Sequence, residues 1–166
     1  MRSSKRVATG GILAALCVVL MLLGTILELG MYLCPMLCGL LLSVAGQRYG
    51  RKYHTMLWLV TSLLCFLLVP GMEANLLFAG FLGWYPILHP VLQKIPNPLR
   101  MVVKLLIFNA SIIAIEALVL LVLVPEFLDT VLIAILLILA NITFLLFDRL
   151  IPVFSDLLRR IFPSKR

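Results

Sequence analysis

Six long apolar runs constrain this chain more than any other feature of its sequence. In chain order they cover residues 7–27, 29–45, 55–69, 75–92, 101–124 and 130–151. A helix needs about 20 residues to cross about 30 Å of hydrocarbon, so a chain of 166 residues is filled by such runs and short connections. Apolar residues make up 63% of the chain, against roughly 45–50% in soluble domains. The sequence predicts an all-α integral membrane protein, with a single domain over residues 1–166.

The placement of charge predicts the orientation of these runs. With six crossings, all 14 Lys and Arg residues fall on one side: at the N-terminus, after the second run, after the fourth run (Lys104 included) and at the C-terminus. The opposite side carries only acidic residues, namely Glu28, Glu73, Glu126 and Asp129. Lys and Arg are retained on the cytoplasmic side of membranes. We therefore expect a six-transmembrane-helix bundle in a cell membrane, with both termini cytoplasmic.

The C-terminal segment has a different pattern. Pro152 is expected to end the sixth crossing, and residues 154–162 follow it. In this segment Phe154, Leu157, Leu158 and Ile161 share one helical face, with Arg159 and Arg160 beside them. An apolar face flanked by basic residues is typical of a helix that lies in the membrane interface. A short interfacial amphipathic helix is predicted here, in contact with membrane lipids.

Several functional classes are excluded by the absence of their motifs. No phosphate-binding loop, nucleophile elbow, zinc-protease helix or dinucleotide fingerprint occurs, so we expect no enzymatic activity and no cofactor. Cys34 and Cys38 are one helical turn apart, but no third metal ligand is near them in sequence, and no metal site is predicted. The net charge of +7 is explained by membrane orientation, so no nucleic-acid partner is expected.

Polar residues inside the apolar runs are the main candidates for function. Glu116 lies within the fifth run, where an acidic residue costs on the order of 2–3 kcal/mol. Asn109 precedes it by two helical turns and shares its face, and Asn141 lies near the middle of the sixth run. One interpretation is that the three side chains converge on a pocket open to the outside. The other is that the asparagines form hydrogen bonds between helices and stabilise the bundle.

The fourth run and the outer rim supply further candidates. Gly83, Pro86 and Pro90 are expected to bend the fourth run and free backbone carbonyls, as in the broken helices that line transporter cavities. Trp84, within this bend, is expected either to stack on a ligand or to pack in the bundle. Tyr32 and Asn75 lie on the predicted outer rim and could take part in binding.

Small residues near the start of the first run form two stripes. Gly11 and Ala15 are four residues apart, as are Gly10 and Ala14. Such spacing allows another helix to approach closely. The partner helix could belong to this bundle or to a different protein.

Taken together, the chain resembles the substrate-binding S components of energy-coupling factor (ECF) vitamin transporters. The resemblance rests on its size and span count, on Gly11 and Ala15 where the family has an Ala-xxx-Ala motif, and on the stretch 83–88 followed by Lys104 and Phe108-Asn109. The resemblance implies a bacterial membrane subunit that captures a vitamin-like micronutrient near the outer leaflet, in a pocket built by helices four to six. Its partners would be a transmembrane coupling subunit, which the small residues of the first helix would contact, and a pair of ATPases.

Two functions of other classes remain open. A non-transporting membrane scaffold, similar to the small rod-shape-determining proteins, would use the small-residue stripes and basic loops for partners. A proton-coupled carrier that acts alone would use Glu116 as its proton site.

Overall fold

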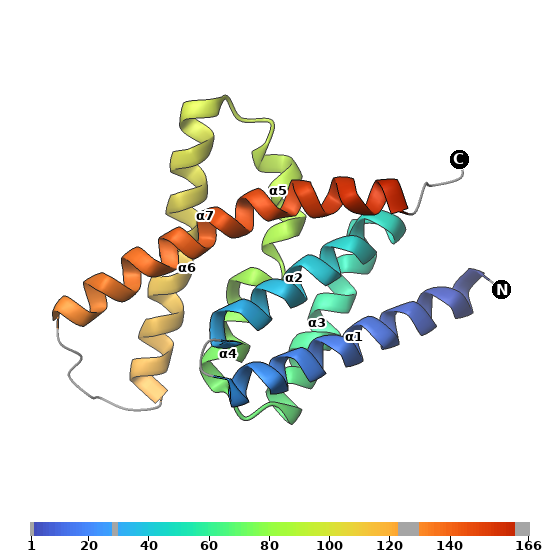
Figure 1. Cartoon of the computed structure of the whole chain (residues 1–166), viewed down its shortest axis with the longest axis horizontal. Coiled ribbons are helices and arrows are strands. Elements are labelled where there is room, and N and C mark those ends of the chain that lie inside the picture. Colours follow the sequence, from blue (N-terminus) through green and yellow to red (C-terminus); the bar gives the residue numbers. More distant parts are fainter. Residues whose placement is uncertain (1, 28–29, 123–129, 162–166) are drawn as a thin grey trace.

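The chain is all-helical over the part that the computed structural model describes, which comprises residues 2–27, 30–122 and 130–161 (Figure 1). No strand occurs among these residues. The predicted rim charges Glu28, Glu126, Asp129, Lys165 and Arg166 lie outside the described residues. The elements are α1 (Arg2–Ile26), α2 (Gly30–Tyr49), α3 (Arg51–Leu68), α4 (Met72–Leu77), the π-helical turn η1 (Phe78–Leu82), α5 (Tyr85–Leu92), α6 (Asn97–Val122) and α7 (Thr130–Ile161).

The helices pack into a bundle with two distinguishable ends. α1 lies along α2 and α3, α7 lies along α2, and α6 crosses α7 steeply (Figure 1). The start of α1, the α2–α3 connection and the last turns of α7 lie at the same end of the bundle. We call this end, which carries Lys5, Arg6, Arg48, Arg51 and Lys52, the basic end. The other end, where α3 passes into α4, carries Glu73 and is called the acidic end.

The predicted break in the fourth run is confirmed. Instead of one helix, residues 72–92 form α4, the wider turn η1, a bend at Gly83 and Trp84, and then α5 with Pro86 in its first turn. A Cβ atom at Gly83 would lie 2.4 Å from Cδ1 of Trp58, so the close approach of α3 to the bend requires glycine here.

The prediction that Pro152 ends the last helix is wrong. α7 continues through Pro152 to Ile161, and the segment expected to form a separate amphipathic helix is the last part of α7. An internal proline removes one backbone hydrogen bond, and helices in membrane proteins tolerate this loss when neighbouring groups compensate. The side chains of residues 157–162 lie outside the described part, so the predicted amphipathic face is not described.

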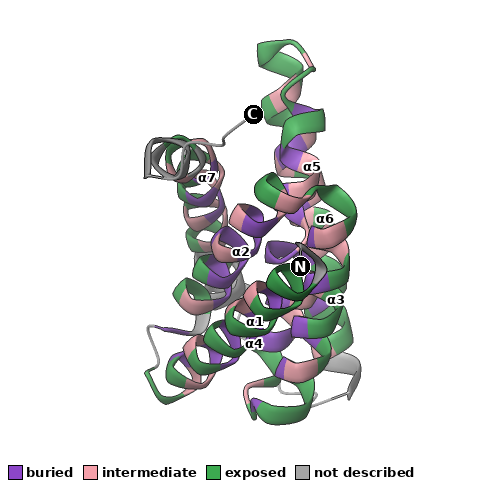
Figure 2. Ribbon diagram, turned by 90° about the vertical axis from the view of Figure 1, so that its right-hand side faces the viewer, coloured by how far each residue is buried: buried purple, intermediate pink, exposed green. Residues whose placement is uncertain are grey.

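The outer surface of the bundle is that of a membrane protein. Among the described residues, four stretches are long and apolar enough to cross a membrane: Ser4–Ile26, Met72–Leu92, Asn97–Val119 and Leu137–Phe154. α2 and α3 are not among these four. Exposed residues cover the outer faces of the helices (Figure 2), and many of them are large and apolar, such as Ile12 at 70% and Leu67 at 80% exposure. Soluble proteins rarely expose apolar surface of this extent.

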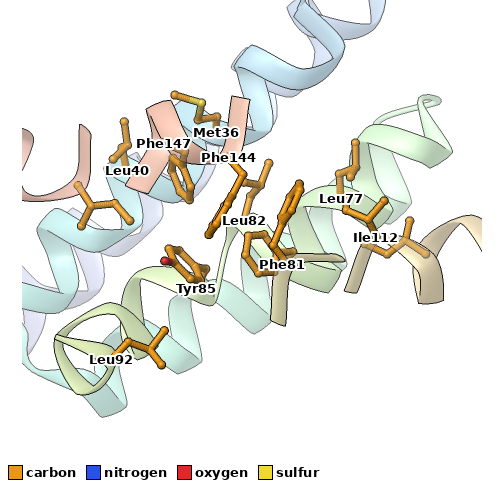
Figure 3. Packing of buried hydrophobic residues seen from close by; sticks show 13 residues of the cluster. Met36, Leu40, Leu77, Phe81, Leu82, Tyr85, Leu92, Ile112, Phe144 and Phe147 are labelled. Atoms are coloured by element: carbon orange, nitrogen blue, oxygen red, sulfur yellow. The ribbon is translucent and has the colours of Figure 1, made fainter. Parts of the chain in front are cut away.

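Two hydrophobic clusters hold the bundle together. One joins α1, α2 and α3 and includes Cys17, Met21 and Leu42. The other lies where the broken segment meets α2, α6 and α7, and Figure 3 shows its aromatic side chains gathered around Phe81 and Tyr85. Phe81 and Tyr85 stack with ring centroids 4.9 Å apart. The side chains of Phe81 and Tyr85 therefore anchor the broken segment in the core of the bundle.

Candidate functional site

A cluster of ionisable side chains is buried between α5, α6 and α7. Nζ of Lys104 donates hydrogen bonds to both carboxylate oxygens of Asp148, at 2.7 and 2.6 Å. The hydroxyl of Tyr85 donates to Oδ1 of the same carboxylate at 2.5 Å. Nε2 of His89 lies 3.5 Å from that oxygen. We call these four residues the ion cluster.

The crossing of α6 over α7 brings the two charges together. Three successive contacts join the helices: Lys104 with Asp148, Phe108 with Phe144, and Asn109 with Asn141. The two phenylalanine rings are stacked, with centroids 4.5 Å apart and planes 8° apart. The α5 members of the cluster, Tyr85 and His89, are one helical turn apart and so reach the same carboxylate.

The ion cluster is well compensated electrostatically. Lys104, His89 and Tyr85 are buried, and Asp148 is only partly accessible. A single charge in such a site is costly, but a pair with additional hydrogen bonds avoids most of that cost. From the sequence, Lys104 is expected among the charges of the cytoplasmic rim. The structure corrects this placement, because Lys104 lies inside α6 and its side chain points into the bundle.

A cavity of about 550 Å³ opens at the basic end beside this cluster. α2, α3, α5 and α7 all contribute to its walls. Its polar lining includes His89 of the ion cluster, together with Ser43, Gln47, Arg51, His54, Gln93 and Asp156. Its apolar lining includes Ile87, Val91 and Ile151. The cavity thus offers hydrogen-bonding and apolar surface to one small molecule, which is the usual character of a ligand site.

Side chains satisfy the carbonyls that the break in the fourth run frees. Nε2 of His54 donates to the carbonyl of Gly83 at 3.1 Å, since a carbonyl oxygen can only accept. Nε1 of Trp84 donates to the carbonyl of Gly80 at 2.6 Å. Trp84 is half-buried and lines a lateral groove between α3 and α5, not the cavity at the basic end.

The predicted convergence of Asn109 and Asn141 occurs, but the two side chains bind each other. Each amide donates to the other, with distances of 3.0 and 3.1 Å between Nδ2 and Oδ1. Each Nδ2 also donates to the carbonyl four residues earlier in its own helix. The geometry is that of the second interpretation, an interhelical contact that joins α6 to α7.

Glu116 lies apart from this pair, on the exposed surface of α6 near the acidic end. It is close enough to Glu73 and to Tyr32 for electrostatic interaction. Tyr32 borders a small apolar pocket of about 30 Å³, which Glu116 does not line. Glu116 does not line the cavity at the basic end either.

Asn75 is buried and serves the end of α3. Its Nδ2 donates to the carbonyls of Cys65 and Val69, at 3.2 and 2.9 Å. These carbonyls belong to the last turn of α3 and to the residue that follows it, where a helix leaves acceptors unsatisfied. The structure thus places Asn75 against backbone and away from the described cavities.

The two small-residue stripes of α1 face different neighbours. Gly10 and Ala14 are buried, and a Cβ atom at Gly10 would lie 2.5 Å from the hydroxyl oxygen of Tyr53 in α3. Gly11 and Ala15 are exposed, and a Cβ atom at Gly11 would meet nothing within 4 Å. The first stripe is therefore used inside the bundle, and the second is accessible to another molecule.

The ion cluster is the candidate site that was not predicted from the sequence. One signal was present: Lys104 falls inside the apolar run 101–124, where a lysine requires an anionic partner. In the described part of the chain, no group of three His, Cys, Asp or Glu side chains could hold a metal ion. No protein-family model, curated protein or solved structure matches this chain.

Proposed function

We propose that this chain is the substrate-binding membrane subunit of an uptake system for a vitamin-like micronutrient. It would act with a separate transmembrane coupling subunit and a pair of ATPases, as its resemblance to S components implies. The observation that carries the proposal is the cavity at the basic end, because its volume of about 550 Å³ lies within the roughly 300–1,000 Å³ of ligand sites. A membrane scaffold would need no such cavity.

The proposal includes six membrane crossings in a bacterial cell membrane, with the basic end in the cytoplasm. α3 supports this count because its outward side chains are apolar, with Leu63 at 71% and Leu67 at 80% exposure. Such a surface suits lipid better than water. The orientation follows from the basic residues around the α2–α3 connection.

In this orientation the cavity opens toward the cytoplasm, and we assign it to the release side of the substrate's path. The outward half is closed by aromatic packing, in which Phe81 contacts Phe108 and Phe144 with centroids 5.2 and 5.5 Å apart. The pocket beside Tyr32, of about 30 Å³, lies in this half. Capture from outside would require these rings to separate. We therefore assign the substrate site to the cavity, in place of the neighbourhood of Glu116.

The accessible stripe of α1 supports docking to a coupling subunit. Gly11 and Ala15 leave a shallow face on which another helix can approach closely. The flanking side chains Val7 and Ile12 are exposed at 72% and 70%, and would be buried by such a partner.

A second candidate function, a proton-coupled carrier that acts alone, is favoured by the ion cluster. His89 lines the cavity and lies 3.5 Å from the carboxylate of Asp148, so solvent in the cavity has access to a titratable group beside a buried ion pair. In this alternative the proton site is Asp148 with His89, in place of Glu116. Uptake driven by a pH gradient without any ATPase, and lost in Asp148→Asn, would support the carrier.

The test of the main proposal is mass spectrometry of small molecules that co-purify with the protein. We expect a stoichiometric ligand in the wild type and its loss in Val91→Trp, because Val91 lines the cavity and the larger ring would fill it. Val102→Trp is the matched control, since Val102 is exposed and lies on α6 outside the cavity. Retention of the ligand in Val91→Trp would refute the cavity as its site.

A further inference from the structure

A lateral groove runs between α3 and α5 and shares Arg51 and Ile87 with the lining of the cavity. It has a volume of about 270 Å³ and is lined by Arg51, Thr55, Trp58, Trp84, Ile87 and Leu88. Apart from Arg51 and Thr55, these side chains are aromatic or aliphatic. The groove lies on the side of the bundle, where a membrane protein contacts lipid.

Arg51, the basic residue of the groove, lies at the α3 N-terminus and so at one end of the groove. Arg51 is the first residue of α3, its side chain is exposed, and no carboxylate among the described residues pairs with it. Gly50, which precedes it, provides no side-chain cap for the helix. The positive charge of Arg51 therefore adds to the partial positive charge of the uncapped N-terminus of α3.

The two tryptophans that line the groove are held by contacts with the broken segment. Trp58 is pressed against the bend, since a Cβ atom at Gly83 would lie 2.4 Å from its ring. Trp84 is held from the opposite side by its hydrogen bond to the carbonyl of Gly80. The two indole rings thus form apolar walls of the groove, and Arg51 supplies its positive charge.

We propose that this groove binds one anionic phospholipid of the leaflet at the basic end. Its phosphate would contact Arg51, and one acyl chain would lie along Trp58, Trp84 and Leu88. The charge complementarity between Arg51 and a phosphate argues for an anionic headgroup, and the length of apolar wall beneath it argues for a lipid in place of a free anion.

The chain provides its own probe for this site. It contains two tryptophans, Trp58 and Trp84, and both line the groove. Bromine atoms on a lipid acyl chain quench indole fluorescence on contact. Tryptophan fluorescence of the protein therefore reports on acyl chains that contact the groove.

The experiment reconstitutes the full chain in bilayers of unlabelled phosphatidylcholine, to which brominated phosphatidylglycerol or brominated phosphatidylcholine is added. We expect the anionic lipid to quench at about fivefold lower mole fraction, the ratio given by ~1 kcal/mol for one basic residue at an anionic membrane surface. Arg51→Gln should remove this preference, and Arg51→Lys should retain part of it. Lys94→Gln, an exposed change outside the groove, should leave it intact.

Three outcomes would overturn the proposal. Equal quenching by the two lipids would show a groove without headgroup recognition. Absence of quenching by either lipid would show that no acyl chain enters. A preference that survives Arg51→Gln would place the headgroup elsewhere. In the wild type, loss of the preference in high salt is a second measurement that does not depend on how any variant folds.

Discussion

Lys104 of α6 and Asp148 of α7 form an ion pair inside the bundle, with Nζ within 2.7 Å of both carboxylate oxygens. Tyr85 donates a further hydrogen bond to this carboxylate, and His89 approaches it. The pair joins two helices that cross steeply and connects both of them to α5.

Removing one partner of this pair should destabilise the protein strongly. We expect Lys104→Met to lower the free energy of unfolding by about 3 to 5 kcal/mol, because Asp148 would remain as an uncompensated charge. The double variant Lys104→Met, Asp148→Leu should lose less than either single variant. Chemical unfolding in detergent micelles, followed by circular dichroism, measures these differences. Lys52→Met, at an exposed position, is the control, and an equal effect there would contradict the role of the pair.

The amide pair of α6 and α7 should contribute a smaller, measurable coupling. Asn109→Leu and Asn141→Leu should each destabilise the bundle, and the double-mutant cycle should give a coupling energy of about 0.6 to 2 kcal/mol. The same unfolding assay applies. Ser111→Ala provides the comparison, since the Ser111 hydroxyl bonds only to the carbonyl of Ile107 in its own helix. Strictly additive single effects would mean that the two amides act independently.

Glu116→Gln should leave ligand retention unchanged. Glu116 is exposed near the acidic end and lines neither the cavity nor the pocket beside Tyr32. The measurement is the amount of co-purified ligand per protein, with Val91→Trp as the variant that should lose it. A large loss in Glu116→Gln would return the substrate site to the acidic end.

Substitutions in the two glycine stripes of α1 should have opposite consequences. Gly11→Leu and Ala15→Leu should preserve thermal stability but abolish co-purification with a coupling subunit, because the accessible stripe would no longer admit a close helix. Gly10→Leu should lower stability, because its side chain would collide with Tyr53. Differential scanning fluorimetry and pull-down with the coupling subunit separate the two effects. Intact association of Gly11→Leu would argue against docking through this face.

The helical class and the break in the fourth run could be predicted because they depend on local sequence. Apolar runs of membrane length predict helices, and Gly83 with Pro86 predicts a bend within them. The continuity of α7 could not be predicted in the same way. Pro152 disfavours a helix locally, but its effect is decided by neighbouring groups that are distant in sequence.

The ion cluster also could not be predicted, because it depends on contacts between residues that are distant in sequence. Lys104 and Asp148 are 44 residues apart, and each is close in sequence to another charge, the half-buried Arg100 or the exposed Arg149. The face that each presents to the bundle depends on how α6 crosses α7. By contrast, the pairing of Asn109 with Asn141 was one of two interpretations available from depth alone, and the structure distinguishes between them.

The register between α6 and α7 also restricts how the molecule can change shape. A polar contact lies on each side of the stacked Phe108 and Phe144, so sliding one helix past the other by a turn, about 5.4 Å, would separate both contacts at once. In any opening or closing of the bundle, α6 and α7 should therefore move together as one rigid unit. The hinge would then fall where these two helices meet the rest of the bundle, at the contacts of α7 with α2 and of α6 with α4 and η1.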